Sequence, residues 1–424
     1  MKYKQYTLKN GLRVILVPVK EMTTATVIAV VGTGSRYENE QENGLAHFLE
    51  HMFFKGTKRR PKAAVIAREL DALGASYNAY TGKERTGYYA KVASDKILGA
   101  MDIIHDLFIH STLPQKEITK ESGAILQEIN MYADQPSRTV YDVFEALVYG
   151  DQHPLGRTIL GPKENITSFR RKDFQEYLKR CYGARNTVLC VAGNFPQGKV
   201  IEKIKKDFAQ LESGDKIECE KFAPEQESPQ LRIKEKKTDQ THMILGVRTG
   251  GATHKDRYAL HVLANILGGG MSSRLFSEVR EKRGLAYSVG ASTDLVKETG
   301  MLIAYAGVEH GNLSAATTLI LKEMKKIARR GVTEEELERA QSGFAGRIAF
   351  GYETSDDIAE HFAEQEVLRE KITLPTETLA KIQRVTRTEI QELAKEIFVN
   401  KGLNYAVIGP HTKNKKDLEE ILHF

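Results

Sequence analysis

The feature that most constrains the fold of this chain is a weak internal repeat. Four short segments of the first half resemble four segments of the second half, in the same order and at separations of about 210 to 220 residues. The pairs are VIAVVGTG with MILGVRTG, GASYNAYTG with GLAYSVGAS, RTGYYAKVASD with ETGMLIAYAGVE, and ESGAILQEI with QSGFAGRIA. Each pair alone is weak, but four pairs in one order indicate a duplicated domain.

The chain divides near its middle. Residues 212–230, ESGDKIECEKFAPEQESPQ, lose apolar periodicity and are rich in Glu, Lys, Ser and Pro, as exposed linkers are. We therefore predict a first domain at 1–213, a linker at 214–230 and a second domain at 231–424. Helical patterns alternate with Gly-punctuated strand patterns, which predicts an α+β fold. Near the N-terminus, Asn10-Gly11 between two strand patterns predicts a two-residue type I′ hairpin.

Composition argues against several classes of protein. The net charge of +6 comes from 62 basic and 56 acidic residues that are mostly interleaved, so KGTKRRPK and KNKK are better explained as solvated surface than as nucleic-acid patches. Cys181, Cys190 and Cys219 have neither C-x-x-C nor disulfide-framework spacing, which fits a reducing compartment. The start lacks a signal-peptide pattern, and no apolar run approaches the roughly 18 residues that span a bilayer. We expect a cytoplasmic protein without nucleic-acid or membrane partners.

The two copies differ at HFLEH, residues 47–51. When the copies are aligned on the first pair of segments, the polar residues of this motif fall on apolar ones: His47 on Leu263, Glu50 on Ile266 and His51 on Leu267. Apolar residues at these positions are typical of a buried helix face. The polar side chains of the first copy therefore need a functional reason.

HFLEH has the spacing of a metal site. In a helix over GLAHFLEHMFFK that ends near Gly56, His47 and His51 lie about 40° apart on one face, with Glu50 on their flank. Two histidines at i and i+4 can bind one Zn²⁺, and a Glu just before the second His can reach a water at the metal. The order His-x-x-Glu-His is that of the inverted zinc motif of a peptidase class. Because the pattern occurs by chance in roughly four sequences of this composition per hundred, a third ligand is needed.

A later segment, PQKEITKESGAILQEINMY, supplies candidates for that third ligand. It predicts a helix in which Glu121 and Glu128, seven residues apart, lie on nearly the same face. Glu128 lies among apolar residues, a costly place for a carboxylate without a partner. The alternative is that both glutamates are ordinary solvated residues of a helix face. The presence of HFLEH favours the metal site.

Together these residues resemble the pitrilysin/insulinase family of zinc peptidases. The resemblance is carried by HFLEH, by Glu128 with another Glu seven residues before it, by the flanking GTGSRYE and HMFFKGT, and by LGGGMSSRLFSEVREKRGLAYSV. It covers essentially the whole chain and favours the branch that contains mitochondrial processing peptidase and its bacterial relatives. It implies that His47, His51 and Glu128 bind one zinc ion per chain. It also implies that Glu50 is the general base and that Glu121 is an outer acid supporting the site.

The resemblance also implies substrate-binding residues. Arg280 and Tyr287 match an Arg and a Tyr, seven residues apart, that contact substrate in the family. SYNAYTG resembles the edge strand on which these peptidases bind an extended peptide through backbone hydrogen bonds, which places Asn78, Ala79 and Tyr80 along the substrate. The alternative is that Arg280 is a salt-bridged helix residue and that Tyr287 is a half-buried core aromatic.

The family architecture implies two homologous α+β domains, each an antiparallel sheet packed with helices, in a clamshell-like peptidase. Two chains would close around a chamber as a homodimer, with Arg280 and Tyr287 acting across it. We therefore predict a zinc-dependent metalloendopeptidase that cleaves peptides or unfolded and leader segments. In this scheme Glu50 takes a proton from the water that attacks the scissile carbonyl. The alternative is a non-catalytic or partner-dependent subunit of a processing-peptidase-like complex with structural zinc.

Overall fold

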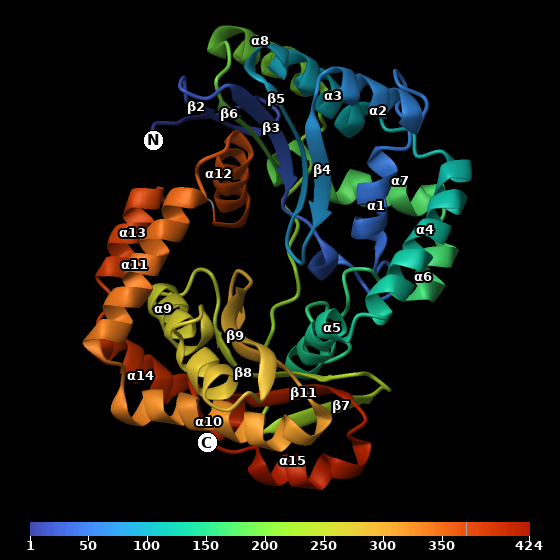
Figure 1. The fold of residues 1–424 in the computed structure, drawn as a ribbon. Coiled ribbons are helices and arrows are strands. Elements are labelled where there is room, and N and C mark those ends of the chain that lie inside the picture. The colour runs from blue at the N-terminus through green and yellow to red at the C-terminus, as the bar shows by residue number, and fades with distance from the viewer. Residues whose placement is uncertain (370) are drawn as a thin grey trace. The chain divides into compact units, whose positions relative to one another are not determined.

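The strand patterns of the first half build a six-stranded sheet in the computed structural model, which describes residues 1–369 and 371–424 (Figure 1). The order across the sheet is β1-β2-β6-β3-β5-β4. The strands are β1 (Lys4–Thr7), β2 (Arg13–Pro18), β3 (Thr24–Val31), β4 (Ser76–Thr81), β5 (Thr86–Ala93) and β6 (Thr187–Gly193). β2 and β6 run parallel, and the other neighbours run antiparallel.

The second half builds a five-stranded sheet with the order β7-β11-β8-β10-β9. Its strands are β7 (Gln230–Glu235), β8 (Thr241–Gly250), β9 (Ala286–Leu295), β10 (Thr299–Val308) and β11 (Leu403–Gly409). This order and its strand directions repeat those of β2-β6-β3-β5-β4. The four segment pairs of the sequence repeat fall on β3 and β8, β4 and β9, β5 and β10, and the helices α4 (Gln115–Ala133) and α11 (Glu334–Phe350). The prediction of two homologous α+β domains is therefore confirmed.

Both sheets are mixed, so the prediction of antiparallel sheets is wrong for one pair of strands in each. β7 and β11 are parallel, as are β2 and β6. In both cases the second strand of the pair follows the first only after a long segment that contains helices. Such a crossover allows neighbouring strands to run in the same direction, which a short hairpin does not.

The predicted two-residue hairpin at Asn10-Gly11 is also wrong. β1 and β2 are joined by residues 8–12, and within this loop only Gly11 has a positive φ, of 96°. A type I′ turn requires a positive φ at both central residues. The Asn10 amide instead donates hydrogen bonds to the backbone carbonyls of Phe208 and Leu211, each at 2.9 Å.

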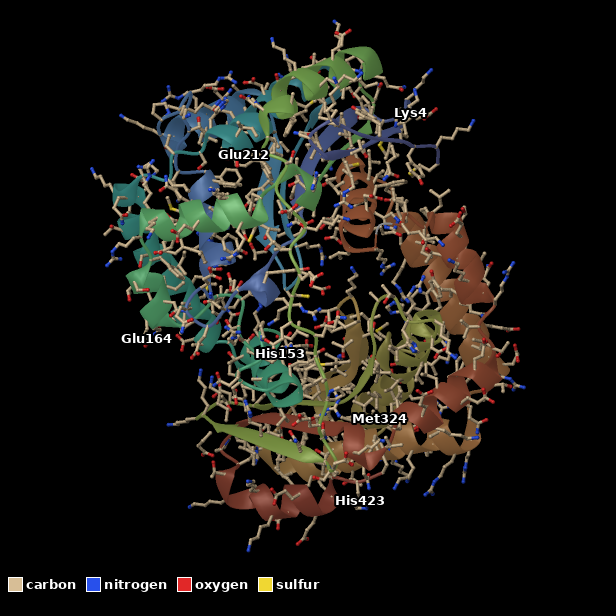
Figure 2. All side chains as sticks on the ribbon, turned by 180° about the vertical axis from the view of Figure 1, so that it is seen from behind. Lys4, His153, Glu164, Glu212, Met324 and His423 are labelled. Atoms are coloured by element: carbon tan, nitrogen blue, oxygen red, sulfur yellow. The ribbon has the colours of Figure 1, made fainter. Side chains whose placement is uncertain are left out.

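Packing divides the chain into two units, and each unit takes a segment from the other half of the sequence. The first unit contains Met1–Ile129, Arg157–Glu220 and Ala349–Leu374, and the second contains Asn130–Gly156, Lys221–Ile348 and Pro375–Phe424. The predicted domains at 1–213 and 231–424 stay a prediction. The packing units differ from them because Asn130–Gly156 and Ala349–Leu374 each pack with the other half of the chain. Residues 212–229, which start at Glu212 in Figure 2, contain no helix or strand.

Helices cover both faces of the first sheet. Besides α4, the helices of this unit are α1 (Leu45–Phe53), α2 (Ala63–Ala72), α3 (Ile97–His110), α6 (Lys163–Ser168), α7 (Arg171–Cys181), α8 (Gln197–Asp207) and α12 (Ser355–Arg369). Side chains alternate along β3, so Val27 joins the larger core beneath α1, while Ile28 and Val30 pack against Phe362 of α12. Burial on both faces explains the continuous apolar sequence of this strand.

The second sheet is covered in the same manner. Its helices are α5 (Pro136–Tyr149), α9 (Arg257–Gly268), α10 (Leu313–Arg330), α11, α13 (Pro375–Gln383), α14 (Arg387–Ile397) and α15 (Lys415–Ile421). Phe144 of α5 packs with Ile244 and Ile303 on one face, and α9, α10 and α14 bury the other face. Within residues 1–369 and 371–424, no helix combines the length and apolarity that a membrane span needs.

Candidate metal centre and active site

Helix α1 carries the HFLEH residues and begins after a glycine in an unusual conformation. Gly44 has φ 102°, and a Cβ at this position would lie 2.7 Å from the carbonyl oxygen of Leu160. The first N–H groups at this end of the helix are capped by the Glu38 carboxylate, which accepts hydrogen bonds from Gly44 N at 2.9 Å and Ala46 N at 2.6 Å. The apolar side chains of α1 are buried in the core. This packing fixes the direction in which His47, Glu50 and His51 point.

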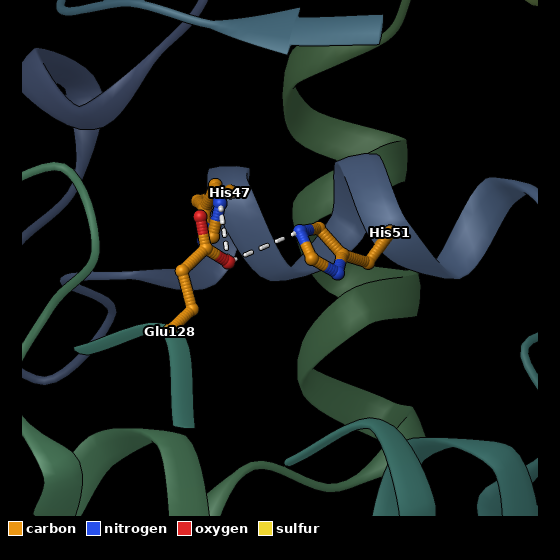
Figure 3. A group of neighbouring side chains, drawn as sticks. All are labelled: His47, His51 and Glu128. Atoms are coloured by element: carbon orange, nitrogen blue, oxygen red, sulfur yellow. Dashed lines mark ion pairs between the residues drawn. The ribbon is translucent and has the colours of Figure 1, made fainter. Parts of the chain in front are cut away.

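Two histidines of α1 and one glutamate of α4 converge (Figure 3). Nε2 of His47 and Nε2 of His51 each lie 3.7 Å from Oε2 of Glu128. The two imidazole centroids are 4.7 Å apart, and one ligand atom of each of the three residues lies within 4.8 Å of the others. Figure 3 shows this carboxylate oxygen facing both rings. The group has the size that one cation needs.

A second carboxylate orients His51. Nδ1 of His51 lies 3.0 Å from Oε1 of Glu121, whose Oε2 lies 2.6 Å from Nζ of Lys55. Burial opposes ionisation of Glu121, but the bonds from His51 and Lys55 outweigh it and hold the Glu121 pKa below its ordinary value. Burial also opposes charge on His51, but the hydrogen bond to Glu121 and the nearby charges of Glu50 and Glu128 raise the His51 pKa. With Nδ1 facing Glu121, Nε2 is left for Glu128, an arrangement typical of metal-bound histidines.

His47 is held by burial alone. Its side chain is almost completely buried, and its Nδ1 has no hydrogen-bond partner in the described part of the chain. Burial, and then the neighbouring His51, lower the pKa of His47 to about 3. Because the neutral imidazole is the form that binds metals, His47 can act as a ligand without first losing a proton.

Glu50 lies on the same helix but outside the three-residue group. Its Oε2 accepts a hydrogen bond from Oγ1 of Thr81 at 2.6 Å. Burial raises the pKa of Glu50 against the opposing effects of Thr81 and His51, and the charge of Glu128 raises it further. A carboxylate with a raised pKa that is not itself a ligand is suited to take up and release a proton.

A second group of neighbouring side chains could also offer ligands: Asp102, His105 and Asp207. Its carboxylates are already neutralised. Asp102 pairs with Arg59 and Arg60 at 2.8 Å each, and Asp207 pairs with Lys203 at 2.7 Å. Burial opposes ionisation of Asp102, but these arginines hold its pKa below the ordinary range. A further cation would have to displace them, so this group is better explained as a salt-bridge network.

The first group fits zinc. Two imidazole nitrogens and a carboxylate oxygen are a ligand set of hydrolytic zinc sites, which keep one position open for water. No lysine or arginine among the described residues forms an ion pair with Glu128, in contrast to Asp102 and Asp207. The unpartnered Nδ1 of His47 is the feature that this fit does not explain.

Comparisons with known proteins decide the family. A family model described as insulinase (peptidase family M16) matches residues 13–163, and one described as peptidase M16 inactive domain matches residues 168–344. The chain is 36% identical over 408 residues to "Uncharacterized zinc protease YmxG" of Bacillus subtilis, which covers 96% of this chain and 98% of that protein. The chain belongs to the M16 (insulinase/pitrilysin) peptidase family. The resemblance inferred from HFLEH and Glu128 is thereby confirmed.

Other proteins are similar along nearly the whole chain. An uncharacterized zinc protease of Mycobacterium leprae is 35% identical over 416 residues, covering 96% of this chain and 92% of that protein. A crystal structure of a protease from Helicobacter pylori superposes with a TM-score of 0.89 at 25% identity and covers 96% of this chain and 99% of that chain. A structure titled peptidase M16 inactive domain, from Pseudomonas fluorescens, shares the fold with a TM-score of 0.89 at 19% identity, over 97% of this chain and 98% of that chain.

In this M16 chain the predicted substrate strand is β4, the last strand of the first sheet. Asn78 is exposed, Ala79 is buried in the core, and the Tyr80 hydroxyl donates a hydrogen bond to Oε1 of Glu364 at 3.1 Å. Because side chains alternate along a strand, Tyr80 points toward α12, on the face opposite Ala79. The outer backbone edge of β4 is unpaired within the described chain. The substrate role of these residues stays a prediction.

Arg280 and Tyr287 are brought together in the second unit. Arg280 lies in a short π-helix, Phe276–Glu281, and Tyr287 lies at the start of β9. The guanidinium carbon lies 4.8 Å from the ring centroid of Phe276 and 5.0 Å from that of Tyr287. The Tyr287 side chain is 77% exposed, so the interpretation of it as a half-buried core aromatic is wrong. Binding of substrate by this pair stays a prediction.

The sequence analysis missed two residues that contact the site. Thr81 donates a hydrogen bond to Glu50, and Lys55 pairs with Glu121. The signals were present but weak. Lys55 follows His51 by four residues, the spacing of one helical turn, and the alternation of SYNAYT places Thr81 on the same strand face as the buried Ala79.

Proposed function

We propose that this protein is a zinc-dependent metalloendopeptidase. The observation that carries the proposal is the position of Glu50. It lies on the same helix as His47 and His51, yet it is hydrogen-bonded to Thr81 and is not a member of the ligand group. A site that only binds a structural metal has no use for a further, half-buried carboxylate. The chain belongs to the M16 family, and proteins similar to it are named zinc proteases, which supports the same reaction.

Each residue of the candidate site has its own role in the proposed reaction. Zinc held by His47, His51 and Glu128 would act as a Lewis acid that makes a water more acidic and polarises the scissile carbonyl. Glu50 accepts the proton of the attacking water and delivers it to the leaving amine. Glu121 occupies Nδ1 of His51 and so keeps Nε2 directed at the ligand group.

The proposed substrates are peptides and unfolded or leader segments. An extended peptide would add to the unpaired edge of β4, with backbone hydrogen bonds beside Asn78, Ala79 and Tyr80. Arg280 and Tyr287 offer a guanidinium and an exposed hydroxyl to the same class of substrate. Binding through the backbone favours chain segments that have no fold of their own.

The proposed assembly is a homodimer with one zinc ion per chain and an enclosed chamber. Its support is the resemblance to the family, together with the presence of both residue sets in one chain. Because this chain carries His47, His51 and Glu128 as well as Arg280 and Tyr287, an identical partner can supply either set. Closed two-fold dimers are also the commonest soluble oligomers.

The competing function is a non-catalytic or partner-dependent subunit with structural zinc. A structural zinc site is normally closed by four protein ligands, often cysteines. Cys181 and Cys190 are buried in apolar cores, and neither they nor Cys219 belong to a described group of possible ligands. The ligand set of two histidines and one glutamate therefore favours the open, catalytic type of site.

The test compares the unmutated protein with Glu50→Gln on a diverse library of quenched fluorescent peptides, with bound zinc quantified in both. We expect equal zinc content and a loss of cleavage of about 100-fold or more in Glu50→Gln, because general-base catalysis is removed. If both proteins hold zinc and neither cleaves any peptide, the non-catalytic subunit replaces this proposal. If Glu50→Gln cleaves as fast as the unmutated protein, Glu50 is not the base.

A further inference from the structure

We propose that Thr81 is the positioning residue for Glu50. Its hydroxyl holds one carboxylate oxygen of Glu50 in place and leaves the other oxygen for the proton that is transferred. The inference rests on the proposed function, since it concerns the orientation of the proposed base. It also connects that base to β4, the strand proposed to bind the substrate.

The contact between the two side chains is short and selective. Oγ1 of Thr81 lies 2.6 Å from Oε2 of Glu50, within the range of about 2.5 to 2.7 Å typical of a hydroxyl bonded to an ionised carboxylate. Within the described chain, Oε2 is the one oxygen of Glu50 with a hydrogen-bond partner. Among residues 1–369 and 371–424, Oε1 has no hydrogen-bond partner, so it is available to accept a proton.

Thr81 points toward α1 because side chains alternate between the two faces of β4. Tyr77 packs against Phe54, just beyond the end of α1, and Ala79 is buried in the core beneath α1. Thr81 follows at the next position of this face, while Tyr80 points the other way to Glu364. A register shift of one residue would turn the hydroxyl away from Glu50.

The hairpin that carries Thr81 is fixed at its tip. Thr81 is paired with Thr86, and between them Gly82 N donates a hydrogen bond to Arg85 O at 2.8 Å. The carbonyl of Gly82 accepts a hydrogen bond from Ser35 N at 3.1 Å. Such support by neighbouring backbone is what holds a functional side chain in one geometry.

The other face of the hairpin is fixed as well. Glu364 of α12 accepts a hydrogen bond from the Tyr80 hydroxyl at 3.1 Å and forms a close ion pair with Arg85. Tyr80 and Arg85, which flank residues 81–84, are thus both anchored to Glu364 of α12. Thr81 presents its hydroxyl from a rigid element, so loss of that hydroxyl releases Glu50 and leaves the hairpin in place.

The test uses Thr81→Val, which keeps the shape and removes the hydroxyl, and Thr81→Ser, which keeps the hydroxyl. Thr86→Val is the matched control, because it removes a buried hydroxyl of the same hairpin that bonds to the carbonyl of Thr33 and not to Glu50. We expect Thr81→Val to lower kcat by about 10- to 100-fold with KM and zinc content little changed, the usual effect of a misplaced catalytic group. Thr81→Ser should retain most of kcat, and Thr86→Val should lower stability without this loss.

Crystal structures of the same zinc-loaded variants give a readout that does not depend on activity. The Glu50 carboxylate should leave its position in Thr81→Val and keep it in Thr81→Ser. An unchanged Glu50 in Thr81→Val, or an unchanged kcat, would overturn the inference. If the unmutated protein cleaves no peptide, the proposed function fails on its own, and the structures still decide whether Thr81 positions Glu50.

Discussion

The two histidines of the candidate metal site on α1 are held in different ways. His51 is oriented through Nδ1 by the Glu121 carboxylate, which is itself paired with Lys55. His47 has no hydrogen-bond partner at Nδ1 among the described residues and is kept neutral by burial. The orientation of His51 therefore depends on the Glu121 side chain, which a substitution can remove. The orientation of His47 depends on the packing of α1.

Replacement of Glu121 should weaken zinc binding. Loss of an outer carboxylate that orients a ligand typically costs 10- to 100-fold in metal affinity. We expect about 10-fold for Glu121→Gln, which keeps an acceptor for His51, and up to about 100-fold for Glu121→Ala. Competition with a chromogenic chelator measures the affinity, with Glu176→Gln, an exposed acid on α7, as the control. Equal affinities for all three variants would show that Glu121 does not support the site.

The two pairs of candidate site residues could be recognised in the sequence because local geometry fixes the spacing within each pair. His47 and His51 are one helical turn apart, and Glu121 and Glu128 are two turns apart on α4, so each pair shares a face whatever the tertiary fold is. Thr81 was not identified because nothing local to β4 indicates that α1 lies beneath it. That contact depends on how a helix and a strand from distant parts of the sequence pack.

At the level of elements, the sequence does not predict which sheet the helices α5 and α12 cover. Each lies in one half of the chain and covers the sheet of the other half. The sequence repeat predicted two sheets with shared topology, which the strand orders confirm. An apolar helix face such as that of α12 is compatible with either sheet, so its partner follows only from packing in three dimensions.

Phe362 on α12 should stabilise the first unit although it lies in the second half of the sequence. Its ring is fully buried against Ile28 and Val30 of β3. We expect Phe362→Ala to lower the free energy of unfolding by about 3 to 5 kcal/mol, the range for a buried aromatic truncated to Ala. Urea unfolding measures it, and Phe350→Ala, at a side chain that is 68% exposed, is the control. A loss below about 1 kcal/mol for Phe362→Ala would contradict this packing.

The strand ends of the second sheet carry a histidine network that should respond to acid. Nε2–H of His310 donates to the carbonyl of Thr238 at 2.9 Å, and Nδ1 of His310 accepts from the Thr241 hydroxyl at 2.8 Å. The same hydroxyl oxygen then accepts from Nε2–H of His411 at 2.5 Å. In this chain of hydrogen bonds the Thr241 hydroxyl donates to His310 and accepts from His411.

Burial, and then the charge of His310, lower the pKa of His411 in the folded state. The unfolded state therefore binds more protons below the ordinary histidine pKa of about 6.5. We expect stability that is fully present above about pH 6.5 and is lost as the pH falls through the folded pKa. His411→Gln keeps an N–H donor and removes the titration, so its free energy of unfolding should vary less over this interval. An identical pH dependence of both proteins would exclude His411 as the cause.

At the scale of the whole molecule, the two copies differ at the positions of the candidate metal ligands. Where the first copy has His47 and His51, the second has Leu263 and Leu267, both fully buried beside the second sheet. The position equivalent to Glu128 is occupied by Ile348, which packs against the same core. The second copy therefore retains the fold, and apolar side chains occupy the positions at which the first copy has its candidate ligands.

Mixing two inactive variants should test the proposed homodimer. Glu50→Gln lacks the base, and Arg280→Ala lacks a proposed substrate contact. If Arg280 serves the substrate of the partner chain, a mixed dimer has one intact site, and a 1:1 mixture after subunit exchange should recover about a quarter of the full activity. Peptide cleavage before and after exchange measures this. No recovery, with exchange verified by mass spectrometry, would show that Arg280 does not act across a dimer.

The most direct test of the account is the location of zinc. Crystals of the zinc-loaded Glu50→Gln protein would be measured on both sides of the zinc absorption edge, so that anomalous density identifies the metal. The account predicts one strong peak per chain, bonded to Nε2 of His47, Nε2 of His51 and the Glu128 carboxylate at about 2.0 to 2.2 Å. A peak at Asp102, His105 and Asp207, or no peak at HFLEH in protein that binds zinc in solution, would contradict it.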